Sequence, residues 1–421
     1  MEDIRHGPGR TPLDFGFQYA GLLLFMIGDG VEVGYLSPYL VSLGMNEHHV
    51  ALLFTVYGLT AAMAAWASGV LCDVFGSRRV IVAGIVLWIV PQGVFLAYAI
   101  PHRDAASILL SYGIRGAGYP LLAYGILTLI MKEVRQERRG FASGLFWFCF
   151  TCGLPTMGTI IAQLSLPLLG EYRTLWLAFG AVLAGGALAL VSLVESPRPP
   201  ASRRGSAVKG EQIARLVIGN PSLVLTCVAR AINSSATHGI IVFMPLYFIN
   251  DAGMTKNQWM LFLEVIFVSN IVFNVVFGAL SDLISWTRTV IWVGGVGSGL
   301  TCLLLYWVPH LYGHASPLYV YLTGALFGLA LAGYVPLSAM APSLLPANPG
   351  LAMSFLNFGA GCSVWLGPLV VYVFQPYLGV AGVIYIYSGL FFLSGLLVSW
   401  IRVPTLHTIA PRNVSTIRLR A

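Results

Sequence analysis

The stretch Gly69-Val-Leu-Cys-Asp73-Val-Phe-Gly76-Ser-Arg78-Arg79 returns 209 residues later as Gly278-Ala-Leu-Ser-Asp282-Leu-Ile-Ser-Trp-Thr-Arg288. Gly, Leu, Asp and Arg recur in register, and Arg139-Gly140-Phe-Ala142 is matched by Pro349-Gly350-Leu-Ala352 at nearly the same offset. The sequence therefore predicts two homologous halves arranged as a parallel repeat. Such repeats are typical of alternating-access transporters, whose substrate binds near the midplane between the halves.

The composition around these motifs is that of a membrane protein. Of the 421 residues, 57% are hydrophobic and only 9% are charged, and the mean hydropathy is +0.81. Soluble domains carry about 25% charged residues, so the composition excludes a soluble enzyme, a nucleic-acid binder and a disordered scaffold. We therefore expect the lipid bilayer as a partner and no nucleic acid.

Twelve apolar stretches are long enough to cross a hydrocarbon core of about 30 Å as helices. They cover residues 17–41, 50–72, 79–99, 105–131, 140–163, 173–194, 221–248, 258–282, 288–309, 316–341, 350–374 and 379–401. This pattern predicts an all-α membrane protein with twelve transmembrane helices in two six-helix halves. The predicted parts are an N-terminal segment, a first half, a Pro-, Ser- and Arg-rich linker, a second half and a tail, at 1–16, 17–194, 195–220, 221–401 and 402–421.

The basic residues predict the orientation. With the N-terminus inside, eighteen of the 23 Lys and Arg residues fall in cytoplasmic segments, and only Arg103, Arg173 and Lys256 fall in outer loops. Basic residues collect on the cytoplasmic side of membrane proteins. We therefore expect both termini in the cytoplasm.

The repeated motif also predicts a gate at the cytoplasmic side. Its glycines permit tight turns, and we expect its aspartate to cap a helix N-terminus or to pair with arginine across the bundle, as a latch that breaks when the gate opens. The alternative is that these charges are plain anchors of orientation. The gate candidates are Gly69, Asp73, Gly76, Arg78, Arg79, Gly278, Asp282 and Arg288.

Five ionisable residues fall inside spans, namely Asp29, Glu32, Arg115, Arg230 and Glu264. A charge at the bilayer centre costs about 2.5–3.5 kcal/mol on insertion scales, so each one indicates function. The first two lie on one helix face, three residues apart. At 1.5 Å per residue, Asp29 lies about 18 Å above the inner end of its span, and Arg115 about 15 Å below the outer end of its own.

These three residues could therefore meet at one level. Two desolvated carboxylates beside one arginine carry one negative charge too many, which favours binding a proton by the coupled pair. We interpret Asp29, Glu32 and Arg115 as a proton-coupling site. The alternative is a static ion-pair cluster that only fixes helix packing.

Other polar and aromatic residues inside spans suggest a cavity for a hydroxylated substrate or one with a single carboxylate. The substrate-binding candidates are Arg230, Asn233, Asn357, Trp147, Tyr119, Tyr57 and Glu264, with Asn270 and Asn274 nearby in sequence. For the asparagines, hydrogen bonds between helices are the alternative. Glu264 lies only about 9 Å below the outer surface, where a solvated vestibule would be enough to hydrate its charge without a role in substrate binding.

No nucleotide-binding Gly-x4-Gly-Lys-Ser/Thr motif occurs, so ATP-driven transport by this chain alone is unsupported. We expect no catalytic residues, no metal site and no cofactor apart from protons as the coupling ion.

Five stretches resemble the bacterial polyol permeases of the major facilitator superfamily, which include the ribitol and D-arabinitol transporters. They are FMIGDGVEVGYLSPYLVSLG (25–44), FTVYGLTAAMAAWASGV (54–70), YGIRGAGYPLLAYGIL (112–127), TLWLAFGAVLAGGALALVSL (174–193) and VARAINSSATHGIIVFMPLYF (228–248). Residues 69–79 also resemble that superfamily's signature loop, with Val74 and Ser77 in place of its usual basic residues.

The resemblance implies a twelve-helix facilitator fold and proton symport of a sugar alcohol across the bacterial inner membrane, by a monomer. It implies coupling on Asp29, Glu32 and Arg115, and Arg230, Asn233, Trp147 and Asn357 fall on matching segments. His238 and Glu264 have no counterpart in the family pattern. A second interpretation is a facilitator or antiporter for a small organic anion, with Arg115 and Arg230 as an anion clamp. A third, a membrane sensor or a lipid-modifying enzyme, has no nucleophile–base pair or soluble domain to support it.

Overall fold

The described part of the chain is helical. The computed structural model describes residues 10–402 apart from 33–34, 46, 192, 194–218 and 313–316, and no strand occurs among the described residues. The predicted linker 195–220 lies outside them except for its last two residues, as do most of the terminal segments 1–16 and 402–421.

Helix occurs in each of the twelve predicted spans. The α-helices of the first half are α1 (Gly16–Val31), α2 (Leu36–Ser42), α3 (Glu47–Val74), α4 (Ser77–Val94), α5 (Ile100–His102), α6 (Ala105–Arg115), α7 (Gly118–Glu133), α8 (Arg139–Thr151) and α9 (Gly158–Leu190). Those of the second half are α11 (Pro221–Leu246), α12 (Lys256–Leu283), α13 (Trp286–Thr289), α14 (Ser298–Tyr312), α15 (Pro317–Ala332), α16 (Leu337–Leu344) and α17 (Pro349–Ser399).

Short 3-10 segments, η1 (Pro12–Phe15) and η3 (Gln136–Arg138), precede α1 and α8. Wider π-helical turns lie at η2 (Phe95–Ala99), η4 (Cys152–Met157), η6 (Tyr247–Asp251) and η7 (Val290–Gly297). By length and composition, nine helices in the described ranges could each cross a membrane.

Two of the long helices contain a sharp turn at a glycine. Gly170 in α9 has φ 74° and Gly379 in α17 has φ 63°, a backbone conformation that residues with a Cβ rarely adopt. Each glycine separates two predicted spans, the fifth from the sixth and the eleventh from the twelfth. The two positions are 209 residues apart, so the backbone repeats with the offset of the sequence motif.

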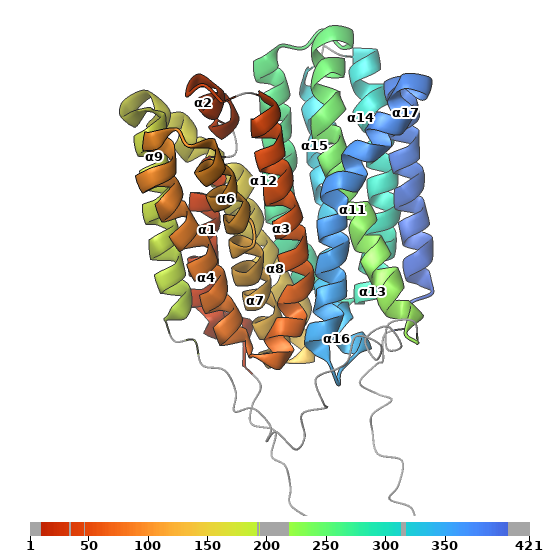
Figure 1. Cartoon of the computed structure of the whole chain (residues 1–421). Helices are drawn as coiled ribbons and strands as arrows, with labels where there is room; N and C mark the ends of the chain where they lie inside the picture. The colour runs from red at the N-terminus through yellow and green to blue at the C-terminus, as the bar shows by residue number, and fades with distance from the viewer. Residues whose placement is uncertain are drawn as a thin grey trace, which may run out of the picture.

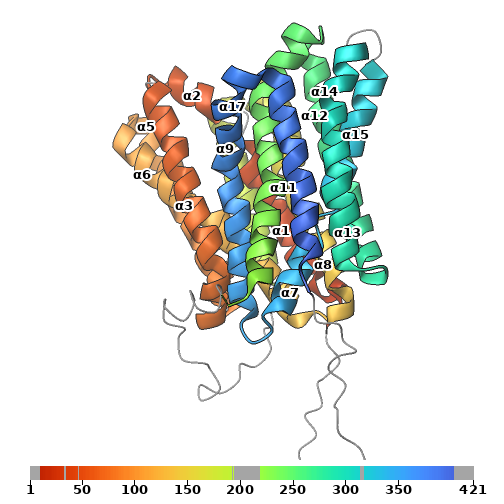
Figure 2. The same cartoon turned by 90° about the vertical axis from the view of Figure 1, so that its right-hand side faces the viewer.

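The two halves stand side by side as bundles, and α3 lies next to α17 where they meet (Figures 1 and 2). The second large contact between the halves joins α8 to α12. The chain therefore has two seams at which its halves can move against one another.

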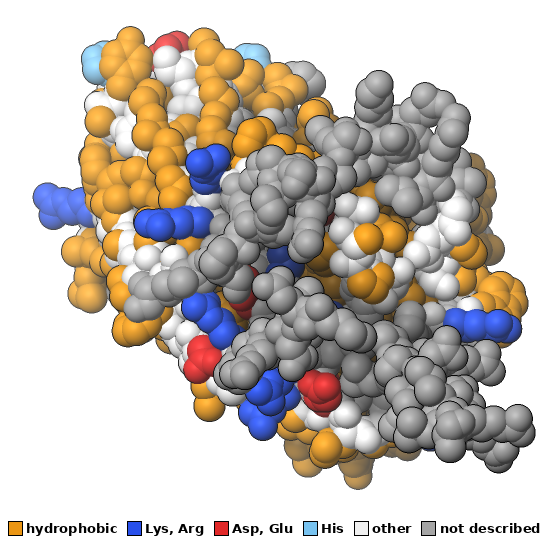
Figure 3. All heavy atoms as spheres, turned by 90° about the horizontal axis from the view of Figure 1, so that it is seen from below, with side chains coloured by type: hydrophobic (Ala, Val, Ile, Leu, Met, Phe, Trp, Pro, Cys, Tyr) orange, Lys and Arg blue, Asp and Glu red, His pale blue; other side chains and the backbone are white. Residues whose placement is uncertain are grey.

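Basic side chains gather at one end of the molecule, seen in Figure 3, which we call the basic end. By the helix ends and turns at which they stand, its described members are Arg10, Arg78, Arg79, Lys132, Arg135, Arg138, Arg139, Arg288 and Arg402. Arg103 and Arg173 lie at the opposite end, beside the turns that follow α5 and Gly170.

Candidate functional site

Asp29, Glu32 and Arg115 meet in the interior of the first half. Arg115 Nη2 lies 3.1 Å from Asp29 Oδ1, and Arg115 Nη1 donates to Glu32 Oε2 at 2.8 Å. Arg115 Nη2 also contacts Glu32 Oε1, so the guanidinium binds that carboxylate with two nitrogens. All three residues are at most 3% exposed, so the site is closed to water.

Helix α4 completes this buried charge cluster with two side chains that the sequence did not indicate. Trp88 Nε1 donates to Asp29 Oδ1 at 2.6 Å, and Gln92 Oε1 accepts from Arg115 Nη1 at 2.7 Å. Tyr112, one turn before Arg115, donates its hydroxyl to Glu32 Oε1 at 2.9 Å. Glu32 thus accepts from a bidentate arginine and a phenol, whereas Asp29 accepts one guanidinium hydrogen bond and one indole hydrogen bond.

Two glycines next to Asp29 explain its orientation. A Cβ on Gly28 would lie 2.6 Å from Val182 Cγ2 and 2.7 Å from the Ala178 carbonyl oxygen of α9. A Cβ on Gly30 would collide with the Leu154 carbonyl in η4. Because only hydrogen fits at both positions, the glycine face of α1 packs against α9 and η4 and directs Asp29 toward α4 and α6.

The cluster has an excess of negative charge if both carboxylates are ionised. One guanidinium faces two carboxylates, and no other Lys or Arg of the described chain forms an ion pair with either acid. Uncompensated charge is expensive at a buried site, and binding one proton removes it.

A layer of tyrosines lies between this cluster and the space between the halves. The Tyr57 ring packs at a tilt of 33° against Tyr112, with ring centroids 4.9 Å apart, and stacks on Tyr119 at 6.4 Å. Arg115 Cζ lies 4.6 Å from the Tyr112 centroid and 5.6 Å from that of Tyr57. Tyr57 and Tyr119 therefore have the cluster on one side and the open space on the other.

That space is a cavity of about 550 Å³ between the two halves. Cavities of about 300–1,000 Å³ suit small metabolites. Its wall holds apolar residues such as Phe54 and Ile266 together with a set of polar and aromatic side chains. These are Tyr57, Tyr119, Tyr124, Trp147, Thr151, Arg230, Asn233, Ser234, Thr237, His238, Asn270, Asn274 and Ser363.

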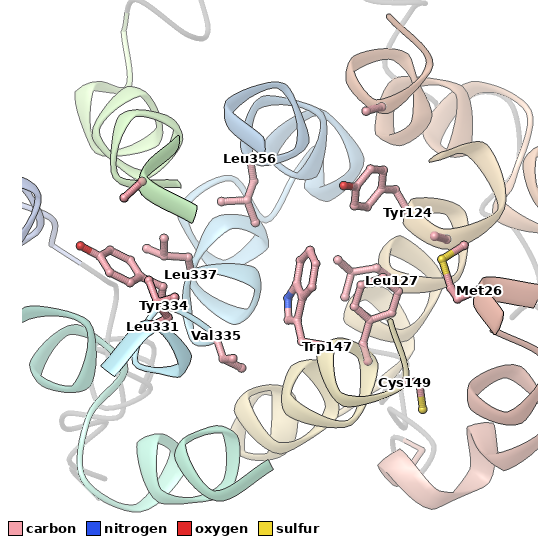
Figure 4. Packing of buried hydrophobic residues seen from close by; sticks show 14 of the residues in the cluster. Met26, Tyr124, Leu127, Trp147, Cys149, Leu331, Tyr334, Val335, Leu337 and Leu356 are labelled. Atoms are coloured by element: carbon pink, nitrogen blue, oxygen red, sulfur yellow. The ribbon is translucent and has the colours of Figure 1, made fainter. Parts of the chain in front are cut away.

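Arg230 lies on the cavity wall against Trp147. Its Cζ is 4.1 Å from the Trp147 ring centroid, and Nη1 donates a long hydrogen bond of 3.4 Å to Asn233 Oδ1. Trp147 also donates to Ser338 Oγ at 3.0 Å, across the boundary between the halves. Figure 4 shows its ring projecting from α8 between Tyr124 and Leu127 on one side and Val335 and Leu337 on the other.

Of the seven predicted substrate-binding residues, the structure places five on the cavity wall and two elsewhere. Asn357 is 2% exposed and donates to Ser68 Oγ at 3.2 Å, so it joins α17 to α3 instead of facing the cavity. Glu264 is exposed on the outer face of α12, between Leu261 and Val268, and does not line the cavity. The structure therefore places neither Asn357 nor Glu264 on the cavity wall, where the sequence had predicted them.

Sequence reasoning did not place Tyr124, Ser234, Thr237 and His238 in the site, although one signal was present. Arg230, Asn233, Ser234, Thr237 and His238 follow the spacing i, i+3, i+4, i+7, i+8, which puts them on one helix face. That polar stripe on α11 is the wall of the cavity. The predicted clamp of Arg115 and Arg230 is not assembled, because Arg115 binds the two carboxylates behind the tyrosine layer.

The repeated aspartates cap helices of the opposite half. Asp73 Oδ2 accepts from the Leu351 amide at 2.9 Å in the first turn of α17, and Asp282 accepts from the Gly140 and Phe141 amides at 2.9 and 2.8 Å in the first turn of α8. Carboxylates are stabilised at helix N-termini. Asp73 pairs in addition with Lys132 at 2.8 Å, not with an arginine.

Glycines bring the backbones together beside each cap. A Cβ on Gly69 would collide with the Gly350 carbonyl, and one on Gly278 would lie 2.7 Å from the Gly140 carbonyl oxygen. Gly76 has φ 91° in the turn before α4. Arg78 and Arg79 are exposed in the first turn of α4, and Arg288 is exposed in α13.

The hydrogen bonds found between described residues of the two halves lie at the basic end or at the floor of the cavity. They join Val70 to Ser354, Leu351 to Asp73, Gly140 and Phe141 to Asp282, Arg139 to Ser343, Ser143 to Val335, Trp147 to Ser338, and Asn357 to Ser68. This structure is therefore closed toward the basic end.

Comparison with known proteins identifies relatives along the whole chain. The Major Facilitator Superfamily model matches residues 19–282 and 226–418. The chain is 38% identical to the alpha-ketoglutarate permease of Bacillus subtilis (strain 168) over 388 residues, covering 91% of this chain and 88% of the relative. It is 34% identical over 396 residues to the D-arabinitol and ribitol transporters of Klebsiella pneumoniae, covering 93% of this chain and 93% and 92% of the relatives.

The fold also has counterparts among solved structures. A crystal structure of the E. coli fucose:proton symporter superposes with a TM-score of 0.77 at 12% identity, covering 93% of this chain and 100% of that one. The predicted all-α membrane fold in two helical halves and the resemblance to polyol permeases are both confirmed, and the count of twelve helices is consistent with these findings.

Proposed function

Because the chain belongs to the major facilitator superfamily, we propose that it carries a small polar metabolite into the cell together with a proton. Like the relatives it resembles, it is a multi-pass membrane transporter and not an enzyme. The observation that carries the proposal is the buried charge cluster, in which two carboxylates bind the same arginine. The layer of tyrosines separates this cluster from the cavity.

We assign the proton to Asp29. Arg115 binds Glu32 through both nitrogens, and Tyr112 donates to it as well. Asp29 keeps fewer charged partners, since its side-chain hydrogen bonds come from one guanidinium nitrogen and from the uncharged indole of Trp88. A carboxylate with weaker compensation at a site closed to water takes the proton first.

Transport then follows alternating access. We propose that the basic end faces the cytoplasm, as the positive-inside rule predicts, and that the membrane is the bacterial inner membrane. The cavity would load from outside while the two aspartate caps hold the cytoplasmic end closed, and it would empty inward when these caps break. Protonation of Asp29 weakens its attraction to Arg115 and loosens α1 from α6, which links the proton to this exchange.

The substrate is a small metabolite with several oxygen atoms. A sugar alcohol is supported by the names of two relatives, the D-arabinitol and ribitol transporters. An organic acid is supported by the name of a third, the alpha-ketoglutarate permease, and by one observation in the cavity, the presence of Arg230 on its wall.

Proteoliposomes test the coupling. In the wild-type protein, an inward proton gradient should drive accumulation of labelled substrate above its external concentration. Asp29→Asn keeps the hydrogen-bonding shape of the side chain but removes its titration. It should lose uphill accumulation while retaining exchange of labelled for unlabelled substrate. Uphill accumulation by Asp29→Asn at the wild-type level would refute the assignment of the proton.

A further inference from the structure

We propose that the substrate carries a carboxylate, that Arg230 binds it, and that the remaining wall of the cavity selects hydroxyl or oxo groups on the same molecule. The metabolite is then a hydroxy- or oxo-acid and not a neutral sugar alcohol. This inference rests on the transport function proposed above and names the substrate class of the same cavity.

Among the residues that the structure describes, Arg230 has no acidic partner. None of the described residues that line the cavity is an acid. Asp29 and Glu32 bind Arg115, and Glu264 lies on the outer face of α12. Of the other thirteen acids of the chain, Glu171 follows the turn at Gly170, and the rest fall, in sequence, at or beyond helix ends: Glu2, Asp3, Asp14, Glu47, Asp73, Asp104, Glu133, Glu137, Glu195, Glu211, Asp251 and Asp282.

The local contacts of Arg230 leave most of its hydrogen-bonding capacity unused. A guanidinium has five N–H donors in a planar fork, and the described contacts are one 3.4 Å hydrogen bond to Asn233 and the face of Trp147. A cation–π contact contributes about 0.5–2 kcal/mol and offsets only part of the cost of removing an arginine from water. A carboxylate matches the guanidinium with two parallel hydrogen bonds.

The wall around Arg230 favours a substrate with further oxygen atoms. Asn274 Nδ2 donates to Asn270 Oδ1, and Asn270 Nδ2 donates to the Gly328 carbonyl, so the Asn274 Oδ1 acceptor remains for a substrate hydroxyl. His238 Nδ1 donates to the Ser234 carbonyl at 2.8 Å, which leaves Nε2 as an acceptor on a neutral ring. Tyr57 and Tyr119 supply hydroxyls from the other half.

The charge balance of transport distinguishes the two substrate classes. A monocarboxylate that enters with one proton moves no net charge, whereas a neutral polyol that enters with one proton carries one positive charge inward. The inference therefore predicts uptake of a monocarboxylate that depends on the pH gradient and is insensitive to membrane potential.

Matched ligands provide the test. D-Arabinonate and D-arabinitol share a carbon chain and its remaining hydroxyl configurations and differ at the carbon that is a carboxylate in one and a CH2OH group in the other; D-ribonate and ribitol form a second pair. 2-Oxoglutarate serves as an oxo-dicarboxylate. Affinity of each probe for the purified full chain is measured by ligand-dependent thermal stabilisation, and uptake is measured in proteoliposomes with and without a valinomycin-set potential.

We expect at least one of the three carboxylates to bind at least tenfold more tightly than ribitol and D-arabinitol. Arg230→Met should weaken that binding at least tenfold and Arg230→Lys by less. Arg173→Met removes an exposed arginine at the opposite end from the basic end and should change nothing. Unaltered unfolding temperatures without ligand, together with the graded response of the lysine variant, separate loss of the anion site from loss of folding.

The inference is overturned if a neutral polyol binds more tightly than its acid partner, if Arg230→Met binds the preferred probe within twofold of wild type, or if none of the five probes binds. Polyol uptake driven by a proton gradient would refute the carboxylate substrate and leave the proposed symport intact. Carboxylate uptake that does not depend on the proton gradient would refute the symport and leave the carboxylate substrate intact.

Discussion

Asp29 in α1 and Glu32 at the C-cap of that helix have different surroundings and should have different roles. We propose that Glu32 holds Arg115 in place and that Asp29 exchanges the proton. The same spacing of three residues on one helix face would suit a symmetric pair, and it is α4 and α6 that make the pair unequal. Of the two acids, Trp88 donates a hydrogen bond only to Asp29, and Tyr112 donates only to Glu32.

The variant Glu32→Gln should therefore destabilise the protein more than Asp29→Asn does. Glu32→Gln removes the carboxylate that accepts from both guanidinium nitrogens and from Tyr112, and a hydrogen bond to a charged group contributes about 1.5–3 kcal/mol. Asp29→Asn leaves Arg115 bound to Glu32 and keeps an acceptor for Trp88. Thermal unfolding of both variants in detergent measures the difference, and a lower unfolding temperature for Asp29→Asn than for Glu32→Gln would contradict the division of roles.

At the scale of helices, the aspartate caps join α3 to α17 and α12 to α8 at the basic end. Each cap combines a carboxylate from one half with a helix N-terminus of the other, and glycines such as Gly69 and Gly278 let the backbones approach. The same device occurs twice because the sequence repeats. Loss of either cap should favour the conformation that is open toward the basic end.

Spin labels can measure this shift. With labels at positions 78 and 283, on exposed residues of the two halves, in a cysteine-free background, Asp282→Ala should increase the population of long distances in double electron–electron resonance. The loss involves two amide hydrogen bonds, and each hydrogen bond to a charged group contributes about 1.5–3 kcal/mol. Asp251→Ala, which changes an acid at the opposite end, should leave the distribution unchanged. A distribution that Asp282→Ala does not alter would show that the cap does not hold the halves together.

Which helix face a residue occupies limited what could be predicted about the site. The meeting of Asp29, Glu32 and Arg115 followed from depth alone, because helical rise converts sequence position into height. The predicted position of Glu264 on the cavity wall was wrong because α12 is apolar over much of its circumference. The periodicity of its sequence therefore could not indicate which face of the helix turns away from the cavity. Trp88 and Gln92 were missed since sideways packing of α4 on α1 leaves no trace in either helix by itself.

At the scale of the whole molecule, the repeat is visible both in sequence and in structure. The motif at Gly69 and Gly278 and the turns at Gly170 and Gly379 share one offset, so each half repeats the same order of helices and connections. The helical halves could be predicted because hydrophobic length and turn glycines are local properties. The volume of the cavity between the halves could not, because it depends on how the bundles tilt.

The orientation in the membrane gives a prediction at this scale. With a cysteine-free background, a cysteine in place of Arg173 should react with a membrane-impermeant maleimide added to intact cells. A cysteine in place of Arg78 should react only after the membrane is permeabilised, because we place the basic end in the cytoplasm. Reaction of the residue 78 variant alone in intact cells would invert the orientation.

We propose that substrate and proton cross the membrane together and that Asp29 carries the proton. The most direct test is the pH inside proteoliposomes, followed with an entrapped dye after the preferred probe is added outside without any imposed proton gradient. The interior of proteoliposomes that hold the wild-type protein should acidify as substrate enters. Proteoliposomes that hold Asp29→Asn should exchange substrate without acidification. Substrate entry at a constant internal pH in the wild type, or acidification by Asp29→Asn, would contradict this proposal.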